Sequence, residues 1–135
     1  MKRTILIPVV LFLFAGSGFN CEPGKVNPDK LTGKLVVAGP CGQYVIQVLK
    51  GDLDSSRIQK MYLDSGFFGK GERYSNVFTV RNVCDFAGYH LSKNDIFTFV
   101  LKDTLPDQNC AVCLIYYPVP TITNTVQQVQ VISGM

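Results

Sequence analysis

The feature that most constrains the fold is the spacing of short apolar runs after residue 30. β-Branched and aromatic residues gather there in runs that Gly, Pro, Asn and Asp interrupt, roughly every eight to twelve residues. No segment beyond residue 30 repeats its apolar residues with the period of a helix. The pattern predicts an all-β domain, a small antiparallel barrel or sandwich without internal repeats. The expected strands lie at 34–39, 43–52, 75–84, 96–103, 111–120 and 124–132, and 56–64 is either a strand or a helical turn.

Three of these segments carry further expectations. The Gly-Pro-Cys-Gly stretch at 39–42 is a turn or a bulge, and a bulge there would bend one long first strand around a barrel corner. Pro118 and Pro120 end the 111–120 strand, because proline cannot donate to a central ladder. Val129 and Val131 alternate with glutamines, which predicts an edge strand at 124–132.

Residues 1–20 are expected to be a cleaved export signal and not part of the fold. Lys2 and Arg3 precede an almost unbroken apolar run from Ile5 to Phe14, and small residues follow at 16–18. The run is about ten residues long, roughly half of what a bilayer-spanning helix needs. Export is therefore favoured over a transmembrane anchor or a buried helix.

Cys21 stands directly after this segment. The arrangement resembles the signal of bacterial lipoproteins, in which the chain is cut just before a cysteine whose thiol is diacylated. Gly18, Phe19 and Asn20 depart from the usual lipobox of Leu, a small residue and Gly or Ala, and are similar to the looser boxes of Bacteroidetes-type lipoproteins. The resemblance implies lipidation of Cys21. Ordinary cleavage near Gly18, which would leave Cys21 as a fifth thiol, is the alternative.

The cysteine count favours lipidation. Five cysteines in an exported chain leave one unpaired, whereas lipidation of Cys21 leaves an even set for an oxidising compartment. We expect Cys41 and Cys84 each to bond one member of the Cys110/Cys113 pair, because positions three apart in a strand face opposite sides. The preferred pairing is Cys41 with Cys110 and Cys84 with Cys113. Redox use of Cys110 and Cys113, or structural zinc, remains an alternative.

The remaining chain divides into a tether and one domain. Residues 21–30 are rich in proline and charge and predict a flexible tether, and residues 31–135 form a single β domain. The chain has 13 basic and 10 acidic residues, and Lys2 and Arg3 belong to the signal. A net charge of +1 is left, and no basic patch in the sequence suggests nucleic acid as a partner.

The run from Cys84 to Phe99 resembles the later strands of netrin-like and tissue-inhibitor domains. Its elements are a cysteine followed by Leu91, Lys93, Asp95, Phe97 and Phe99 at alternate positions. The resemblance covers about a third of the chain and implies an OB-type barrel laced by disulfides. The N-terminal Cys-x-Cys of that family is missing, and no inhibitory residue carries over.

Few residues suggest chemistry. His90 is the only histidine, and although Cys84 and Asp85 are near it in sequence, a surface loop explains it better than a hydrolase site. The chain has no serine-nucleophile motif, phosphate-binding glycine loop or metal spacing. We therefore expect no enzyme activity, no cofactor and no metal.

The candidate binding surface is the segment 64–76, expected to be the longest non-strand segment past the tether. Its candidate residues combine aromatic and basic side chains, as recognition surfaces do, and the Tyr116–Tyr117 pair could extend the same surface. The phenylalanines could instead cap the barrel. The candidate binding residues are Phe67, Phe68, Lys70, Arg73 and Tyr74.

The function expected from these features is a lipid-anchored, non-catalytic binding or structural module of the bacterial cell envelope. It would be held to the membrane, in the outer membrane, by its lipid and stabilised by disulfides, with an unknown protein or glycan partner. The alternative is an envelope thiol–disulfide protein that uses Cys110 and Cys113.

Overall fold

The computed structural model of the chain describes residues 29–66, 70–111 and 113–133. The predicted signal, Cys21, most of the tether, and Phe67 and Phe68 lie outside the described residues. The described chain is built from strands, with one 3₁₀ turn and one short helix. In chain order these are β1 (Leu31–Ala38), β2 (Tyr44–Lys50), η1 (Ser55–Arg57), β3 (Gln59–Asp64), β4 (Glu72–Val80), α1 (Val83–Ala87), β5 (Ile96–Lys102) and β6 (Thr123–Ser133). The all-β prediction is confirmed.

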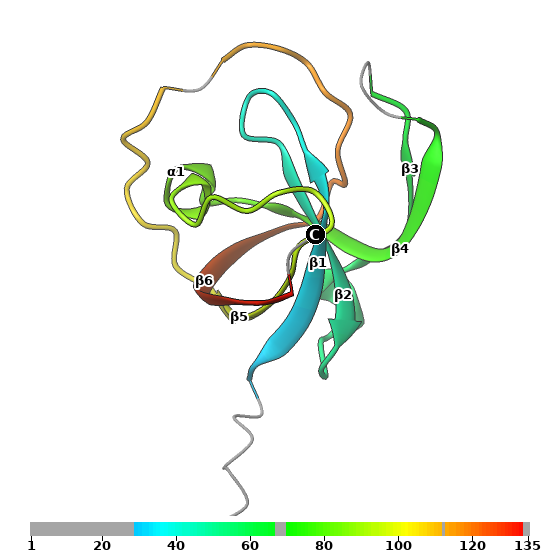
Figure 1. Cartoon of the computed structure of the whole chain (residues 1–135), viewed down its shortest axis with the longest axis vertical. Coiled ribbons are helices and arrows are strands. Elements are labelled where there is room, and N and C mark those ends of the chain that lie inside the picture. Colours follow the sequence, from blue (N-terminus) through cyan, green and yellow to red (C-terminus); the bar gives the residue numbers. More distant parts are fainter. Residues whose placement is uncertain (1–28, 67–69, 112, 134–135) are drawn as a thin grey trace, which may run out of the picture.

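The strands form one sheet that closes on itself. Their order is β2-β1-β5-β6-β4-β3, and β2 also pairs with β4, so that five strands form a barrel and β3 lies outside it on β4 (Figure 1). The β4–β6 pair is parallel, and the other pairs are antiparallel. A five-stranded Greek-key barrel with this order, and with its helix between β4 and β5, has the topology of the OB-type barrel.

The barrel interior is filled by aromatic and branched side chains. The rings of Phe97 and Phe99 lie 5.7 Å apart, and Phe99 lies 5.9 Å from Phe78. Gly33 allows β1 to pass close to these side chains, because a Cβ there would come within 2.8 Å of both Ile46 and Phe99. The fully or nearly fully buried residues of this inner cluster are Leu31, Leu35, Ile46, Phe78, Val80, Phe86, Phe97, Phe99 and Val126.

A second cluster is buried on the outer face of the barrel. It consists of Val36, Val37, Val45, Tyr62, Val77 and Tyr117. A register shift in β1 between Leu35 and Val37 accompanies the burial of consecutive valines. Strand β3 and the segment around Tyr117 therefore cover apolar residues that an isolated barrel would expose to water.

The structure decides between the alternatives at 39–42 and corrects the strand predicted at 75–84. The turn alternative at 39–42 is confirmed and the bulge is wrong, because these residues are part of a tight turn that makes β1 and β2 a hairpin, in which Gly39 N donates to Gln43 O at 2.8 Å. No long first strand bends around a barrel corner there. Strand β4 ends at Val80, and residues 83–87 form α1. The helix places Phe86 in the inner cluster, where its ring lies 6.1 Å from that of Phe97.

The predictions for the end of the chain also need correction. Strand β6 lies between β5 and β4 and is not an edge strand, since its parallel pairing with β4 helps to close the barrel. Residues 111–120 form no strand in their described part. Side chains satisfy carbonyls there that a ladder would otherwise use: Tyr62 Oη donates to Pro118 O at 2.8 Å and Thr79 Oγ1 to Pro120 O at 2.7 Å.

Candidate functional site

The longest connection in the domain is the segment between β5 and β6, residues 103–122, which we call the clamped loop. It arches outside α1 and the β1–β2 turn (Figure 1). Two disulfides bind it to the body of the domain: Cys84–Cys110 joins it to α1, and Cys41–Cys113 joins it to the β1–β2 turn. The Cα atoms of the two pairs lie 5.5 and 5.3 Å apart.

The disulfides follow the predicted scheme in one respect and not in another. Cys41 and Cys84 each bond one member of the 110/113 pair, but the preferred pairing of Cys41 with Cys110 and Cys84 with Cys113 is wrong. The path of the chain explains the outcome, since the clamped loop meets α1 first and the β1–β2 turn second. At α1, Gln108 Oε1 accepts from Cys84 N at 3.1 Å, which brings the following Cys110 to Cys84.

The tip of the clamped loop, Leu114, Ile115 and Tyr116, is the most exposed apolar feature of the described chain. The exposed fractions of these three residues are 100%, 55% and 88%. The backbone of the tip is held at the same time, because Gln43 Nε2 donates to Ile115 O at 3.1 Å. The tip therefore presents three large side chains to solvent from a backbone fixed to the β1–β2 turn.

The residue after the tip anchors it on the other side. Tyr117 is buried, and its hydroxyl donates to Asp64 Oδ1 at 2.7 Å. Its ring lies over Gly66, where a Cβ would overlap the ring atoms. The tip is thus bounded by the Cys41–Cys113 disulfide and by a buried tyrosine.

The electrostatics of this anchor favour the protonated phenols. Burial first, and then the hydrogen bond to Asp64 and the charge of that carboxylate, raise the pKa of Tyr117 to about 12. Burial is also the main cause that raises the pKa of Tyr62, with the charge of Asp64 second. Both hydroxyls therefore remain donors at neutral pH, and the tip stays anchored.

The predicted binding segment 64–76 is only partly a loop. Strand β3 ends at Asp64 and β4 begins at Glu72, so the connection is 65–71. It is not the longest non-strand segment, because the clamped loop is longer; this error follows from reading 111–120 as a strand.

Among the candidate residues of that segment, Lys70 and Arg73 are exposed. Tyr74 Oη donates to Glu72, which also accepts from Lys93 Nζ at 2.9 Å. These two hydrogen bonds lower the pKa of Glu72, and the one from Tyr74 has the larger effect. The binding role of this loop stays a prediction, because Phe67 and Phe68 lie outside the described residues.

Of the Tyr116–Tyr117 pair, Tyr117 meets this loop, and the two residues differ in environment. Tyr117 contacts Gly66 and is buried, whereas Tyr116 is exposed. The sequence did not single out Leu114 and Ile115. The available signal was the close pair Pro118 and Pro120, which disfavours a ladder in the residues just before it.

Two of the residues considered for catalysis, His90 and Cys84, have environments that the structure describes. His90 lies exposed in the connection after α1, with a backbone φ of 52°. Cys84 is bonded to Cys110, so its sulfur is not a free thiol. Within the described ranges, no three His, Cys, Asp or Glu side chains are grouped so as to hold a metal ion.

Comparisons with family models, with curated proteins and with solved structures found no match for this chain.

Proposed function

We propose that this protein is a lipid-anchored, non-catalytic binding module of the bacterial cell envelope, and that the tip Leu114–Ile115–Tyr116 is its contact with a protein partner. The observation that carries the proposal is the combination of exposed apolar side chains and a fixed backbone at the tip. Large apolar side chains in water are unfavourable for an isolated domain, and aromatic anchors on a rigid backbone are what protein interfaces use.

The clamped geometry also lowers the cost of binding. A flexible loop loses conformational entropy when a partner immobilises it, and rigid loops avoid much of that loss. The Cys41–Cys113 disulfide precedes the tip and the Tyr117–Asp64 hydrogen bond follows it, so the tip is held before any partner arrives.

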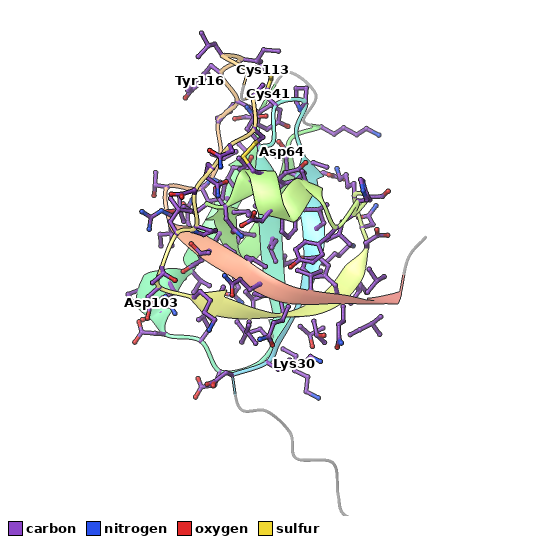
Figure 2. All side chains as sticks on the ribbon, turned by 90° about the vertical axis from the view of Figure 1, so that its left-hand side faces the viewer. Lys30, Cys41, Asp64, Asp103, Cys113 and Tyr116 are labelled. Carbon is purple, nitrogen blue, oxygen red and sulfur yellow. A yellow bond between two sulfur atoms is a disulfide. The ribbon has the colours of Figure 1, made fainter. Side chains whose placement is uncertain are left out.

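The position of the tip favours a protein over the membrane as its partner. Figure 2 shows Cys41, Cys113 and Tyr116 at one end of the domain and Lys30, where the chain enters β1, at the other end. A lipid on Cys21 would lie on the Lys30 side of the domain, since the predicted tether 21–30 leads there. The tip would then point away from the anchoring bilayer.

The compartment is consistent with this role. Two disulfides indicate an oxidising environment outside the cytoplasm. Export by residues 1–20 and lipidation of Cys21 supply the route and the anchor, and an outer-membrane location is part of the proposal.

The alternative redox function requires Cys110 and Cys113 to act as a pair. In the structure each is bonded to a different cysteine, Cys84 and Cys41. A structural role for all four cysteines is therefore favoured.

Site-specific photo-crosslinking in cells tests the proposed contact. A photoreactive amino acid at position 116 should give one adduct of defined mass, whereas the same residue at position 61 should give none. Met61 is a matched control, because it is a large exposed side chain on β3. Adducts of equal yield at both positions, or none at 116, would contradict the proposal.

Substitution of the tip residues provides a second test of the proposed contact. Leu114→Ser together with Tyr116→Ser should abolish the adduct formed from position 115 and leave the melting temperature nearly unchanged, because exposed side chains contribute little to stability. A large fall in melting temperature would show that the tip packs within its own domain.

A further inference from the structure

A pocket of about 320 Å³ lies on the outer surface where η1, β4, β5 and β6 come together, and we call it the basic pocket. Three basic side chains from three different parts of the chain line it: Arg57, Arg81 and Lys102. Arg57 closes η1, Arg81 follows β4, and Lys102 ends β5. These residues are far apart in sequence, so they form no basic run along the chain.

Two consecutive residues of β6 hold the backbones of all three basic residues. Asn124 Nδ2 donates to Arg57 O at 2.8 Å, and Arg81 N donates to Asn124 O at 2.9 Å. Lys102 is paired with Thr125 in the β5–β6 ladder. The backbones from which the three cations project are therefore all held to β6.

The charge of the basic pocket is only partly compensated. Arg57 forms an ion pair with Asp103, whose side chain is 90% exposed. Neither Arg81 nor Lys102 has an ion-pair partner among the described residues. Three cations thus face one carboxylate, in a chain with a small net charge once the predicted signal is set aside.

A buried hydroxyl adds an independent observation. Thr125 lines the basic pocket and is 2% exposed. Its Oγ1 is buried without a hydrogen-bond partner among the residues that the structure describes. Buried polar groups are nearly always satisfied, so an unsatisfied hydroxyl in the wall of a cationic pocket points to a ligand that supplies the acceptor.

We propose that the basic pocket binds a phosphate group, as a small phosphate ester or as the head group of a phospholipid. Guanidinium groups match the geometry of phosphate oxygens, an ammonium adds a point charge, and a threonine hydroxyl donates to a further oxygen. Three cations suffice for one phosphate but are too few to follow a nucleic-acid backbone. The proposal goes beyond the function of the tip and does not require it.

The location of the basic pocket leaves both sources of phosphate in reach. Figure 2 shows Asp103, at the rim of the pocket, toward the end of the domain where Lys30 lies and away from Cys113. If Cys21 is lipidated, this end lies nearer to the bilayer. A head group and a soluble ester would use the same cations, and only binding measurements with each separate them.

The test is a titration of the ¹⁵N-labelled protein, followed by NMR, with inorganic phosphate at constant ionic strength. Phosphate should shift the backbone amides of Arg81, Lys102 and Thr125 saturably, whereas chloride should not. Arg81→Met and Lys102→Met should each weaken the affinity at least about fivefold, the scale of one lost charge-assisted contact. Arg73→Met and Lys60→Met, which remove exposed cations elsewhere on β4 and β3, should leave it unchanged.

Thr125→Val separates binding from folding. The hydroxyl has no partner to lose, so this variant should keep its melting temperature while its affinity for phosphate falls. Shifts that do not saturate, that chloride reproduces, or that survive Arg81→Met unchanged would overturn the proposal. A Thr125→Val variant that binds phosphate like the wild type would remove the hydroxyl from the site and overturn the proposal in this form.

A second titration identifies the source of the phosphate. Vesicles of phosphatidylglycerol and phosphatidylcholine are compared at equal lipid concentration with glycerol 3-phosphate in solution. Competition by phosphatidylglycerol vesicles for the amides shifted by phosphate supports a lipid head group, and competition by glycerol 3-phosphate alone supports a soluble ester. Failure of every phosphate compound to compete would overturn the site.

Discussion

At the scale of single residues, Asp64 is the group that joins the clamped loop to the barrel. Its side chain is buried and accepts from Tyr117, and Tyr62 Oη lies 3.4 Å from the same oxygen. A buried carboxylate needs such donors, because desolvation without hydrogen bonds is costly. The same contacts hold the two phenols in their protonated form.

The pH dependence of stability follows from Tyr117. Its pKa is about 12 in the folded protein, against an ordinary value of 10, so the folded state holds the proton more tightly than the unfolded state. This stabilisation is complete below pH 10 and is lost as the pH rises toward 12. Denaturant titrations at pH 8 and pH 11 should show a loss of about 1 kcal/mol from this group.

The control compares two tyrosines. Tyr117→Phe should reduce the loss between pH 8 and pH 11, whereas Tyr116→Phe, at an exposed position, should not. Equal pH profiles for Tyr117→Phe and the wild type would contradict the role of this hydroxyl.

At the scale of elements, Asn82 continues the pairing of β4 with β6 after β4 has ended. Its Nδ2 donates to Val126 O at 2.8 Å, and its Oδ1 accepts from Val126 N at 2.9 Å. The side chain thus replaces one residue of a strand while the backbone turns into α1. Because the Asn82 side chain makes the hydrogen bonds to Val126 that a strand backbone would make, the backbone is free to leave β4 and form α1 before β5.

Asn82→Ala should therefore destabilise the fold strongly. It leaves the buried backbone N–H and C=O of Val126 without partners, which costs about 2–4 kcal/mol for the two groups. The measurement is the free energy of unfolding in urea. Asn109→Ala, at an exposed position of the clamped loop, is the matched control and should change stability by less than about 0.5 kcal/mol.

The disulfides act on the same scale, because they fix the clamped loop to two other elements. Cys41 and Cys113 are separated by 72 residues and Cys84 and Cys110 by 26. On the chain-entropy model, loops of these lengths correspond to about 4 and about 3.5 kcal/mol of stability. The effect is large for a domain of this size.

Replacing Cys41 and Cys113 together by serine should lower the free energy of unfolding by up to about 4 kcal/mol. It should also weaken the crosslink from position 116 while leaving the tip side chains in place. Replacing Cys84 and Cys110 should cost stability but affect the crosslink less, since that disulfide lies further from the tip in the chain. An unchanged crosslink without the Cys41–Cys113 disulfide would show that the tip needs no clamp.

At the scale of the whole molecule, the two ends of the domain differ in chemistry. One end carries the apolar tip on the clamped loop, and the other receives the chain at Lys30 (Figure 2). No helix of the described residues is long and apolar enough to cross a membrane. In our proposal a lipid on Cys21 attaches the protein to the membrane, and the anchored end and the binding end are separated by the length of the barrel.

Mass spectrometry of the native protein tests this anchor. We expect the chain to begin at Cys21 with acyl groups on that residue, and Cys21→Ser should move the protein from the membrane fraction to the soluble fraction, because a chain without acyl groups lacks its anchor. An unmodified N-terminus at Phe19 or Asn20 would contradict lipidation. Retention of the tip crosslink in a soluble Cys21→Ser protein would show that binding and anchoring are separate.

Much of the fold could be predicted from local pattern. The runs at 34–39, 43–52, 96–103 and 124–132 all overlap strands of the structure, because apolar and β-branched residues favour strands wherever they find a partner. The segment 111–120 misled this approach. It has the composition of a strand, but Tyr62 and Thr79 donate to the carbonyls of Pro118 and Pro120, and Cys113 is bonded to Cys41.

By itself the sequence determined the all-β class and the participation of four cysteines in two long-range disulfides. The composition of the strands and the even number of cysteines after Cys21 can be read along the chain without knowing which residues meet. Only the tertiary structure decided which cysteines meet, because pairing depends on the path of the clamped loop past α1 and the β1–β2 turn. Closure of the barrel likewise determined which side chains lie together on the surface. It exposed Leu114 and Tyr116 on a fixed backbone and brought Arg57, Arg81 and Lys102 together around Asn124 and Thr125, contacts between residues that only a folded chain makes neighbours.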